Sequence, residues 1–356
     1  MPKRIAILGI KDWDYALTCR SHHLAVALAQ CGSNVTYIDP LWLPSSDNQP
    51  KAESSLNYEI EEAGPTEITR IRAVGGLRPS LRQASCEELY KRAGSLLRDA
   101  LLRRQSQFDV VIMSMPLDIH LAIAFENAAL VADFVDHYAG YFPNLANQQQ
   151  KFLREAACVF CVSEPLMGLA RLSNTHCVFL PNALPPRQPP YPAAKAGMVY
   201  AGAINERMGL AWLETVAKQL PSYRLSLFGP IQTRVDSLLK LPNVAYHGTV
   251  DHDALMQRLP SYQIGLVPFD RRSVAYYCDP MKAYDYLAAD LVVLGAPLPA
   301  LERLRPYVVC VSDPTEIAPV AARELTLYRS YRLGAEFVRR ESWSARAAEM
   351  LDVFSG

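Results

Sequence analysis

The sequence has no long apolar run and no surplus of charge of either sign. Its 356 residues include 36 Lys and Arg against 36 Asp and Glu, so the formal net charge is zero. No apolar stretch approaches the roughly 20 residues that a membrane-spanning helix needs. At the N-terminus, charge returns too early in MPKRIAILGIKDWD for a signal peptide. A neutral chain also lacks the basic surplus of nucleic-acid-binding proteins. We therefore expect a cytoplasmic protein with no nucleic-acid partner.

Glycine-rich phosphate motifs are absent as well. The segments LGIKDWDYA (8–16) and YAGAINERMG (200–209) include the ends of predicted strands, but they lack the G-x-G-x-x-G spacing of dinucleotide sites. The P-loop pattern G-x-x-x-x-G-K-[ST] does not occur. These absences disfavour P-loop chemistry and a nicotinamide-dependent oxidoreductase, although the oxidoreductase stays open as an alternative.

The eight cysteines form no metal-binding pattern. Cys158 and Cys161 make a C-x-x-C, but they lie in ACVFCVS, a predicted buried strand in which residues three apart face opposite sides. No second Cys or His pair has a suitable spacing. We predict no metal site and thiols that stay reduced.

Strand-like and helix-like segments alternate along almost the whole chain. In the first half the predicted strands are KRIAILGI, NVTYID, FDVVIMS, LVADFVD, CVFCVS and HCVFLPN, and residues 17–32 are predicted to form a helix ending at Gly32. In the second half the predicted strands are GMVYAGAI, YRLSLFGP, NVAYHGTV, YQIGLVPF, LVVLGAP and YVVCVSD. This alternation indicates an α/β protein with two doubly wound parallel sheets.

A proline-rich segment separates the two halves. We expect a Rossmann-like domain over residues 1–184, a linker over 185–197 and a second Rossmann-like domain over 198–326. Helices over 327–356 are expected to pack back toward the first domain. The two domains should face a central cleft. Ligands of open α/β sheets bind beyond the carboxyl ends of the strands, so the informative side chains should follow strands.

One cation lies where a helix is predicted to begin. In DPMKAYDYLAAD (279–290), Asp279 suits the N-cap and Pro280 the first helical position, which places Lys282 in the first turn. The helix dipole disfavours a cation there by about 0.3–1 kcal/mol. A multiply charged anion bound at the helix N-terminus would make the lysine favourable.

A second cation follows a strand of the same domain. Asn205 suits an N-cap and places Arg207 in a first turn, while Gly202 at the strand end lets the backbone approach a ligand closely. For each cation, a chance position on the surface is the alternative. Taken together, Arg207 and Lys282 predict a diphosphate site.

Seven short motifs follow one another along the chain. They are FVDH (134–137), VSEPL (162–166), LPNA (180–183), YAGAI (200–204), LPNVAYHGTV (241–250), VPF (267–269) and DPMKAYDYLAADLVV (279–293). In their order and spacing the chain resembles glycosyltransferases of the GT-B fold, and among these the bacterial polysaccharide enzymes similar to the xanthan glucuronosyltransferase. The resemblance implies sugar transfer from a nucleoside-diphosphate sugar, with UDP favoured, to a hydroxyl of a glycan, glycolipid or small molecule. It implies no metal and no cofactor, because the nucleotide sugar is a substrate.

The resemblance also implies a set of donor-binding residues. They are Gly202, Arg207, Gly248, Thr249, Val250, Tyr276, Tyr277, Met281, Lys282 and Asp285. Lys282 and Arg207 match positions that neutralise the donor phosphates. Asp285 matches an acidic position that holds the ribose hydroxyls, and the turn 248–250 matches a backbone site for the base. Tyr277 replaces a glutamate that is frequent in the superfamily, so the two tyrosines and Met281 are expected to form a wall for the sugar or base. Aromatic core packing is the alternative.

A carboxylate in the first domain is the candidate general base. The stretch LVADFVDHYAG (130–140) places Asp133 inside a strand and Asp136 at its carboxyl end, beside His137. Inverting transfer needs a base for the proton of the acceptor hydroxyl, and Asp136 matches the catalytic aspartate of the glucuronosyltransferase type. A turn or capping aspartate is the alternative. His137 either orients Asp136 or faces solvent.

The loop after the first strand is expected to line the acceptor side. Asp12, Trp13 and Asp14 imitate a metal-binding D-x-D motif, but the donor phosphates already have cations in the second domain. His22 and His23 are expected to serve the core or the first turn of a helix rather than catalysis.

Residues 85–104 are predicted to form a basic amphipathic helix. Nine Arg or Lys stand against three acids over 70–104, and the predicted apolar face comprises Leu89, Ala93, Leu96, Ala100 and Leu101. Such a helix either contacts an anionic membrane, which would place the protein at its inner face, or covers the sheet as a solvated helix.

Two further functions stay open at this point. A nucleotide-sugar epimerase shares the expected fold. A non-catalytic two-lobed sensor would close on a nucleotide or sugar without reaction.

Overall fold

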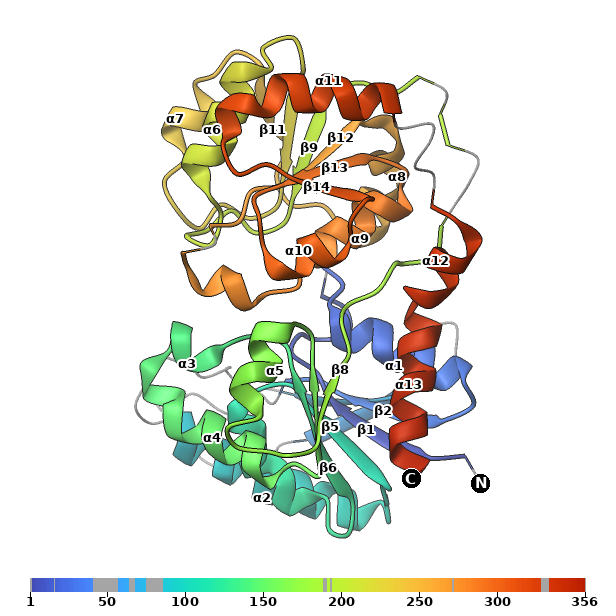
Figure 1. Ribbon diagram of the computed structural model, residues 1–356. Helices are drawn as coiled ribbons and strands as arrows, with labels where there is room; N and C mark the ends of the chain where they lie inside the picture. Colours follow the sequence, from blue (N-terminus) through green and yellow to red (C-terminus); the bar gives the residue numbers. More distant parts are fainter. Residues whose placement is uncertain are drawn as a thin grey trace. The chain divides into compact units, whose positions relative to one another are not determined.

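The computed structural model describes residues 2–15, 17–40, 57–63, 68–74, 86–187, 191–192, 194–270, 272–327 and 333–355. The chain divides into two compact units (Figure 1). Unit 1 contains Met1–Pro181 and Arg346–Gly356, and unit 2 contains Asn182–Ala345. The acceptor and donor roles of the two halves, and the domain ranges attached to them, remain predictions.

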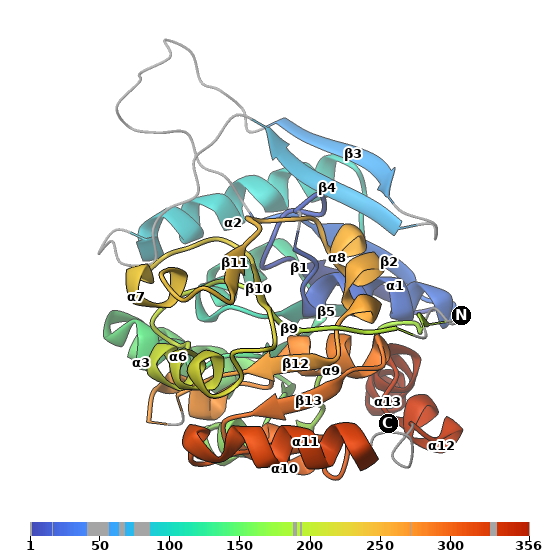
Figure 2. The ribbon, with the colours of Figure 1, turned by 90° about the horizontal axis from the view of Figure 1, so that it is seen from above.

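Unit 1 is built on an eight-stranded sheet. Its strands are β1 (Arg4–Leu8), β2 (Asn34–Ile38), β3 (Asn57–Ala63), β4 (Ile68–Val74), β5 (Val110–Met113), β6 (Ala129–Phe134), β7 (Cys158–Cys161) and β8 (Cys177–Phe179). They lie in the order β3-β4-β2-β1-β5-β6-β7-β8, parallel throughout except for the antiparallel pair β3–β4 at one edge (Figure 2). The six predicted strands of this half are confirmed. Strands β3 and β4 were not predicted, because charged residues that are uncommon in strands interrupt NYEIEEA and ITRIRAV.

Helices cover both faces of this sheet. They are α1 (Arg20–Gln30), α2 (Cys86–Arg103), η1 (Pro116–Ala124), α3 (Tyr138–Tyr141), η2 (Pro143–Leu145), α4 (Ala146–Glu155), α5 (Glu164–Ala170) and α13 (Trp343–Ser355). Arg20 of α1 binds Asp133 of β6, and Phe354 of α13 packs on Phe160 of β7. Asp133 and Phe160 are register partners, so α1 and α13 share a face. Helices α2 and α4 pack against η1 on the other face (Figure 1).

Unit 2 is built on a six-stranded parallel sheet. Its strands β9 (Met198–Ala201), β10 (Leu225–Phe228), β11 (Val244–Tyr246), β12 (Ile264–Val267), β13 (Val292–Gly295) and β14 (Val308–Cys310) lie in the order β11-β10-β9-β12-β13-β14. One core is formed with α6 (Leu210–Gln219), α7 (Asp236–Leu239) and α11 (Ile317–Leu327), and another on the opposite face with α8 (His252–Arg258), α9 (Met281–Ala288), α10 (Pro299–Arg303) and α12 (Ala335–Arg340) (Figure 1). The described part of the unit also contains the 3-10 helices η3 (Leu259–Ser261), η4 (Val274–Tyr277) and η5 (Pro314–Glu316). The six predicted strands of this half are confirmed.

The proline-rich segment packs against the C-terminal end of α9. The Tyr191 hydroxyl donates to the Ala288 carbonyl at 2.5 Å, and Lys195 forms an ion pair with Asp290 at 3.0 Å. Cations at this end of a helix are favoured by its dipole. Residues 188–190 and 193 of the segment lie outside the described residues.

Helix α2 uses its apolar face inside unit 1. Its buried side chains are Tyr90, Ala93, Leu97, Ala100 and Leu101, and the helix packs on η1. This packing favours the alternative of a helix that covers the sheet, while membrane contact through its exposed cations stays a prediction. Residue 85 of the predicted range lies outside the described residues. Over the described ranges, no helix combines the length and the apolar character needed to cross a membrane.

A buried ion pair ties α1 to the sheet of unit 1. The Arg20 Nε donates to both carboxylate oxygens of Asp133 at 2.9 and 3.0 Å, and the two side chains are 4% and 1% exposed. The Arg20 Nη1 and the Arg346 Nε both donate to the carbonyl of Pro181, at 3.1 and 3.0 Å. The last residue before the chain enters unit 2 is therefore held by two guanidinium groups.

We expect Arg20→Leu to destabilise unit 1 by about 3–5 kcal/mol, because it leaves the Asp133 carboxylate buried without its partner. Urea denaturation followed by circular dichroism measures the loss. Arg4→Leu is the matched control, since the Arg4–Asp109 pair is even shorter at 2.7 Å but much more exposed, and should cost much less. Equal losses in the two variants would contradict this account of the buried pair.

Candidate functional site

The strand order of unit 2 reverses at the neighbouring pair β9 and β12. Ligands of open α/β sheets bind beyond the carboxyl ends of the strands at such a switch point. Gly202 directly follows β9, and Phe269 comes two residues after β12. This edge of the sheet is the candidate site.

The side chain of Lys282 reaches this switch point from the start of α9. Its Nζ donates to the Tyr200 hydroxyl at 3.2 Å and lies 4.3 Å from the Tyr200 ring centroid and 4.5 Å from that of Phe269. Gly202 has φ +134°, and a Cβ at this position would lie 2.9 Å from the Lys282 Nζ. The structure shows the lysine side chain in close contact with Gly202, and the expected close approach of a ligand to this glycine stays a prediction.

The surroundings of Lys282 lower its pKa to about 7. Burial is the larger cause, and the like charge of Arg207 is the next. Within the described part of the chain, the ammonium contacts the Tyr200 hydroxyl and two aromatic rings but forms no ion pair with a carboxylate. An anion would stabilise the charged form of such a lysine. Phosphate oxygens suit this position.

Helix α9 begins one residue later than predicted. Its N-cap is Pro280 rather than Asp279. The Asp279 carboxylate is already engaged, because it accepts hydrogen bonds from the Asn182 N–H at 2.7 Å and the Tyr284 hydroxyl at 2.9 Å. Lys282 still lies in the first turn, as expected.

The predicted position of Arg207 in a first turn is wrong. Helix α6 begins at Leu210 with Gly209 as its N-cap. The Asn205 Oδ1 accepts from the Arg207 N–H at 3.1 Å, so Asn205 caps a tight turn before the helix instead. Arg207 nevertheless lies near enough to Lys282 to depress the pKa of the lysine.

Asp285 lies one turn further along α9 and faces His252 of α8. The His252 Nε2 is 3.6 Å from the Asp285 Oδ1, and both side chains are largely buried. Burial alone would lower the pKa of His252, but the nearby carboxylate of Asp285, with those of Asp251 and Asp253, raises it overall. A carboxylate beside an imidazole offers acceptor oxygens that suit the hydroxyls of a sugar.

The turn after β11 belongs to the same edge of the sheet. Gly248 has φ +75° and accepts a hydrogen bond from the Gly229 N–H at 2.8 Å. A Cβ at Gly229 would clash with the carbonyl of Gly202, so the two strand ends are in close contact. Thr249 is exposed and Val250 half-buried.

Tyr276 and Tyr277 lie in η4, just before α9. Their rings meet edge to face with centroids 5.5 Å apart. Tyr276 is 39% exposed, which disfavours core packing for this side chain. Met281 is half-buried at the start of α9. Their roles at a donor site stay predictions.

In unit 1, Asp136 and His137 follow β6, and both are half-buried. The backbone carbonyl of Asp136 accepts from the Tyr138 N–H at 3.0 Å. The His137 Nδ1 lies 3.3 Å from the Nε2 of Gln149 in α4. Asp133 lies inside the strand, as expected.

The D-W-D loop after β1 is fixed to the sheet of unit 1. Asp14 pairs with Arg70 at 2.5 Å, and Arg70 also binds Asp39 at 2.6 Å. The Trp13 N–H donates to the Asp39 Oδ1 at 3.0 Å. The Asp12 carbonyl lies 3.0 Å from the Nε2 of His22, in the first turn of α1. Among the described residues, no cluster of three His, Cys, Asp or Glu side chains is placed to hold a metal.

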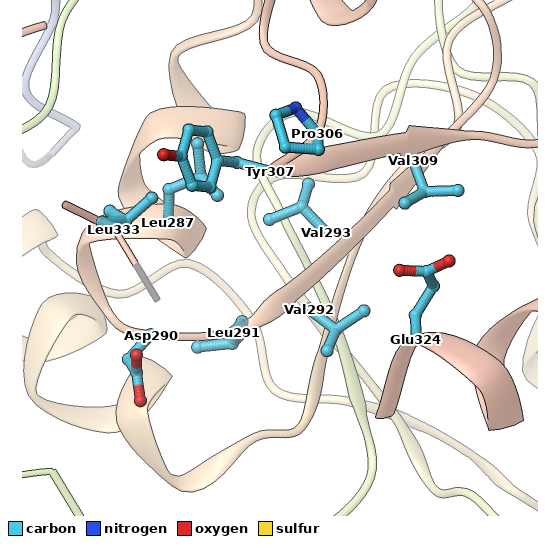
Figure 3. A pocket seen from close by; sticks show the side chains of 10 residues that line it. All are labelled: Leu287, Asp290, Leu291, Val292, Val293, Pro306, Tyr307, Val309, Glu324 and Leu333. Atoms are coloured by element: carbon cyan, nitrogen blue, oxygen red, sulfur yellow. The ribbon is translucent and has the colours of Figure 1, made fainter. Parts of the chain in front are cut away.

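Two cavities lie at the opposite, amino ends of strands. Figure 3 shows the first, about 30 Å³, with apolar side chains between two separated carboxylates, Asp290 and Glu324. The volume of this cavity is far below that of ligand pockets, which is roughly 300–1,000 Å³. The second, about 300 Å³, is lined in part by Arg4 and Asp109, which flank the starts of β1 and β5. Neither lies where ligands of such sheets bind.

Sequence reasoning missed Tyr200, Phe269, His252 and Gln149. Tyr200 and Phe269 occur in apolar strand motifs, where aromatic residues indicate core packing. His252 directly follows a capping Asp251, and Gln149 is the middle residue of three consecutive glutamines. The available signal was that Gln149 falls on the apolar face of its helix. A polar residue on that face is expected to be buried, and a buried amide needs hydrogen-bond partners.

No protein-family model matches the chain. Over 114 residues it is 28% identical to "Putative teichuronic acid biosynthesis glycosyltransferase TuaH" of Bacillus subtilis (strain 168). The match covers 31% of this chain and spans 29% of that relative's length.

Solved structures are similar over essentially the whole chain. The catalytic domain of starch synthase IV from Arabidopsis thaliana, bound to ADP and acarbose, has a TM-score of 0.70 at 8% identity and covers 100% of this chain and 99% of its own. Apo OtsA has a TM-score of 0.67 at 13% identity and covers 99% of each. Arabidopsis thaliana UGT89C1 complexed with UDP-L-rhamnose has a TM-score of 0.59 at 12% identity and also covers 99% of each. With its two parallel Rossmann-like sheets, the chain has the GT-B fold.

Proposed function

We propose that the chain is a glycosyltransferase that uses a nucleoside-diphosphate sugar, with UDP favoured, as its donor. The observation behind the proposal is the Lys282 ammonium, held at the switch point of unit 2 beside Arg207 and between two aromatic rings. The partial likeness to TuaH and the nucleotides bound to two similar structures, ADP and UDP-L-rhamnose, support it.

In the proposed complex, Lys282 and Arg207 neutralise the diphosphate. Asp285 accepts the ribose hydroxyls and the turn 248–250 receives the base. Side-chain cations then supply the positive charge that a divalent ion provides in other transferases, so the proposed reaction is metal-independent. Asp14 is engaged by Arg70, which disfavours metal binding by its loop, and the proposal keeps Asp12, Trp13 and Asp14 on the acceptor side.

In the proposed step, Asp136 removes the proton of the acceptor hydroxyl while the oxygen attacks the anomeric carbon. The bond from that carbon to the diphosphate oxygen breaks, and the configuration inverts. The nucleoside diphosphate leaves with the electron pair, and Lys282 and Arg207 stabilise its charge.

The acceptor in this proposal is a hydroxyl of a glycan, a glycolipid or a small molecule. We also propose that the chain is related to the bacterial polysaccharide enzymes similar to the xanthan glucuronosyltransferase. The proposal also includes a cytoplasmic location, with contact to the inner face of the membrane through the exposed cations of α2.

A panel of UDP-, ADP-, GDP- and dTDP-sugars tests the proposal. The purified chain is incubated with each donor and a set of sugar acceptors in EDTA, and release of nucleoside diphosphate is measured together with product mass. We expect release that depends on the acceptor with at least one donor. Conversion of a donor into its epimer without release would overturn the proposal in favour of an epimerase.

The affinity for UDP should fall as the pH rises above 7. Free Lys282 loses its proton near pH 7, whereas the bound diphosphate favours the charged amine, so binding takes up a proton. Calorimetric titration between pH 7.5 and 9 should show a loss of up to about tenfold per pH unit. The terminal phosphate, with a pKa of about 6, is already ionised in this range.

The lysine is the source of this slope if Lys282→Met both weakens binding and removes the pH dependence. Lys218→Met, on the exposed end of α6, is the matched control and should behave as wild type. A slope that persists in Lys282→Met would assign the titration to another group.

Asp136→Asn should lower the rate of transfer by about 10²–10⁴-fold and leave the Kd for UDP unchanged, because the donor residues belong to unit 2. The anomer of the product, read by NMR, should be opposite to that of the donor. Undiminished transfer would turn attention to His137, Asp12 and Asp14, and a retained anomer would contradict the inverting mechanism.

A further inference from the structure

Gln149 is a buried polar residue that the proposed reaction has not yet used. It lies in α4, is 7% exposed and contacts the segment that follows β6. Its Oε1 accepts a hydrogen bond from the Ala139 N–H at 2.9 Å, and its Nε2 lies 3.3 Å from the His137 Nδ1. The amide therefore bridges a backbone donor and an imidazole nitrogen.

The backbone donor fixes which way the amide faces. A backbone N–H can only donate, so the amide oxygen must face Ala139 and the amide nitrogen must face His137. The amide nitrogen can also only donate. The His137 Nδ1 is thus an acceptor, and the proton of the neutral imidazole is on Nε2.

We propose that Gln149 is a positioning residue that holds His137 in the Nε2–H tautomer, so that His137 offers a hydrogen-bond donor beside Asp136 and not a second base. The group that it meets in a substrate is then an acceptor oxygen, such as a hydroxyl or ring oxygen of a sugar. The role of the His137 donor toward a substrate rests on the proposed function, whereas the assignment of the tautomer does not.

The neighbouring glutamines provide a matched test. Gln149→Glu keeps an oxygen for the Ala139 N–H but replaces the amide donor with a second carboxylate oxygen. When ionised, that oxygen can only accept, so a hydrogen bond to it requires a proton on the His137 Nδ1. Gln150→Glu makes the same change at the exposed residue next to it on α4 and leaves the imidazole contact intact.

The test is a long-range ¹H–¹⁵N correlation spectrum of the histidine side chains, with His137 assigned by its loss in His137→Asn. In the wild type and in Gln150→Glu we expect an unprotonated Nδ1 and a protonated Nε2. In Gln149→Glu we expect a protonated Nδ1. A wild-type His137 with its proton on Nδ1, or a Gln149→Glu spectrum identical to the wild type, would overturn the inference. Should Gln149→Glu fail to fold, the wild-type spectrum alone decides.

Kinetics then separate this inference from the proposed function. With a working donor and acceptor, Gln149→Glu should lower kcat by up to about 100-fold and leave the donor KM unchanged, while Gln150→Glu should match the wild type. Absence of any transfer by the wild type would count against the proposed function and leave the tautomer result standing. Full activity in a Gln149→Glu variant with a protonated Nδ1 would overturn the positioning role.

Discussion

The candidate site of unit 2 depends on one lysine ammonium placed against two aromatic rings. Lys282 lies over the rings of Tyr200 and Phe269, which come from β9 and from the segment after β12. Burial and the like charge of Arg207 destabilise its charged form. Such a position is unfavourable in a protein that binds nothing there, and it becomes favourable when an anion supplies the missing negative charge.

The surrounding backbone is shaped to admit this lysine. Gly202 leaves room for its terminal carbon and nitrogen. Asp279 is occupied by Asn182 and Tyr284 instead of capping α9, so this carboxylate, three residues before the lysine, does not pair with it. In unit 1, Asp133 lies inside β6 and is paired with Arg20, whereas Asp136 comes after the end of the same strand. This contrast distinguishes carboxylates that hold the fold from those that remain candidates for chemistry.

Most of the fold could be predicted from the sequence, and much less of the site. Buried parallel strands are continuous apolar runs, so twelve of them could be assigned, whereas the charged NYEIEEA of β3 could not. The position of Lys282 in a first turn followed from local signals. The start of α6 did not follow from local signals, because an asparagine such as Asn205 can cap a turn as well as a helix. The pairings of His252 with Asp285 and of Gln149 with His137 join residues 33 and 12 positions apart, which only the tertiary structure brings together.

A crystal structure of the chain with UDP tests the central claim most directly. We predict that a diphosphate oxygen lies within about 3 Å of the Lys282 Nζ, over the carboxyl ends of β9 and β12. A nucleotide bound with its phosphates elsewhere, while Lys282 keeps its contacts with Tyr200 and Phe269 and meets no anion, would contradict the account.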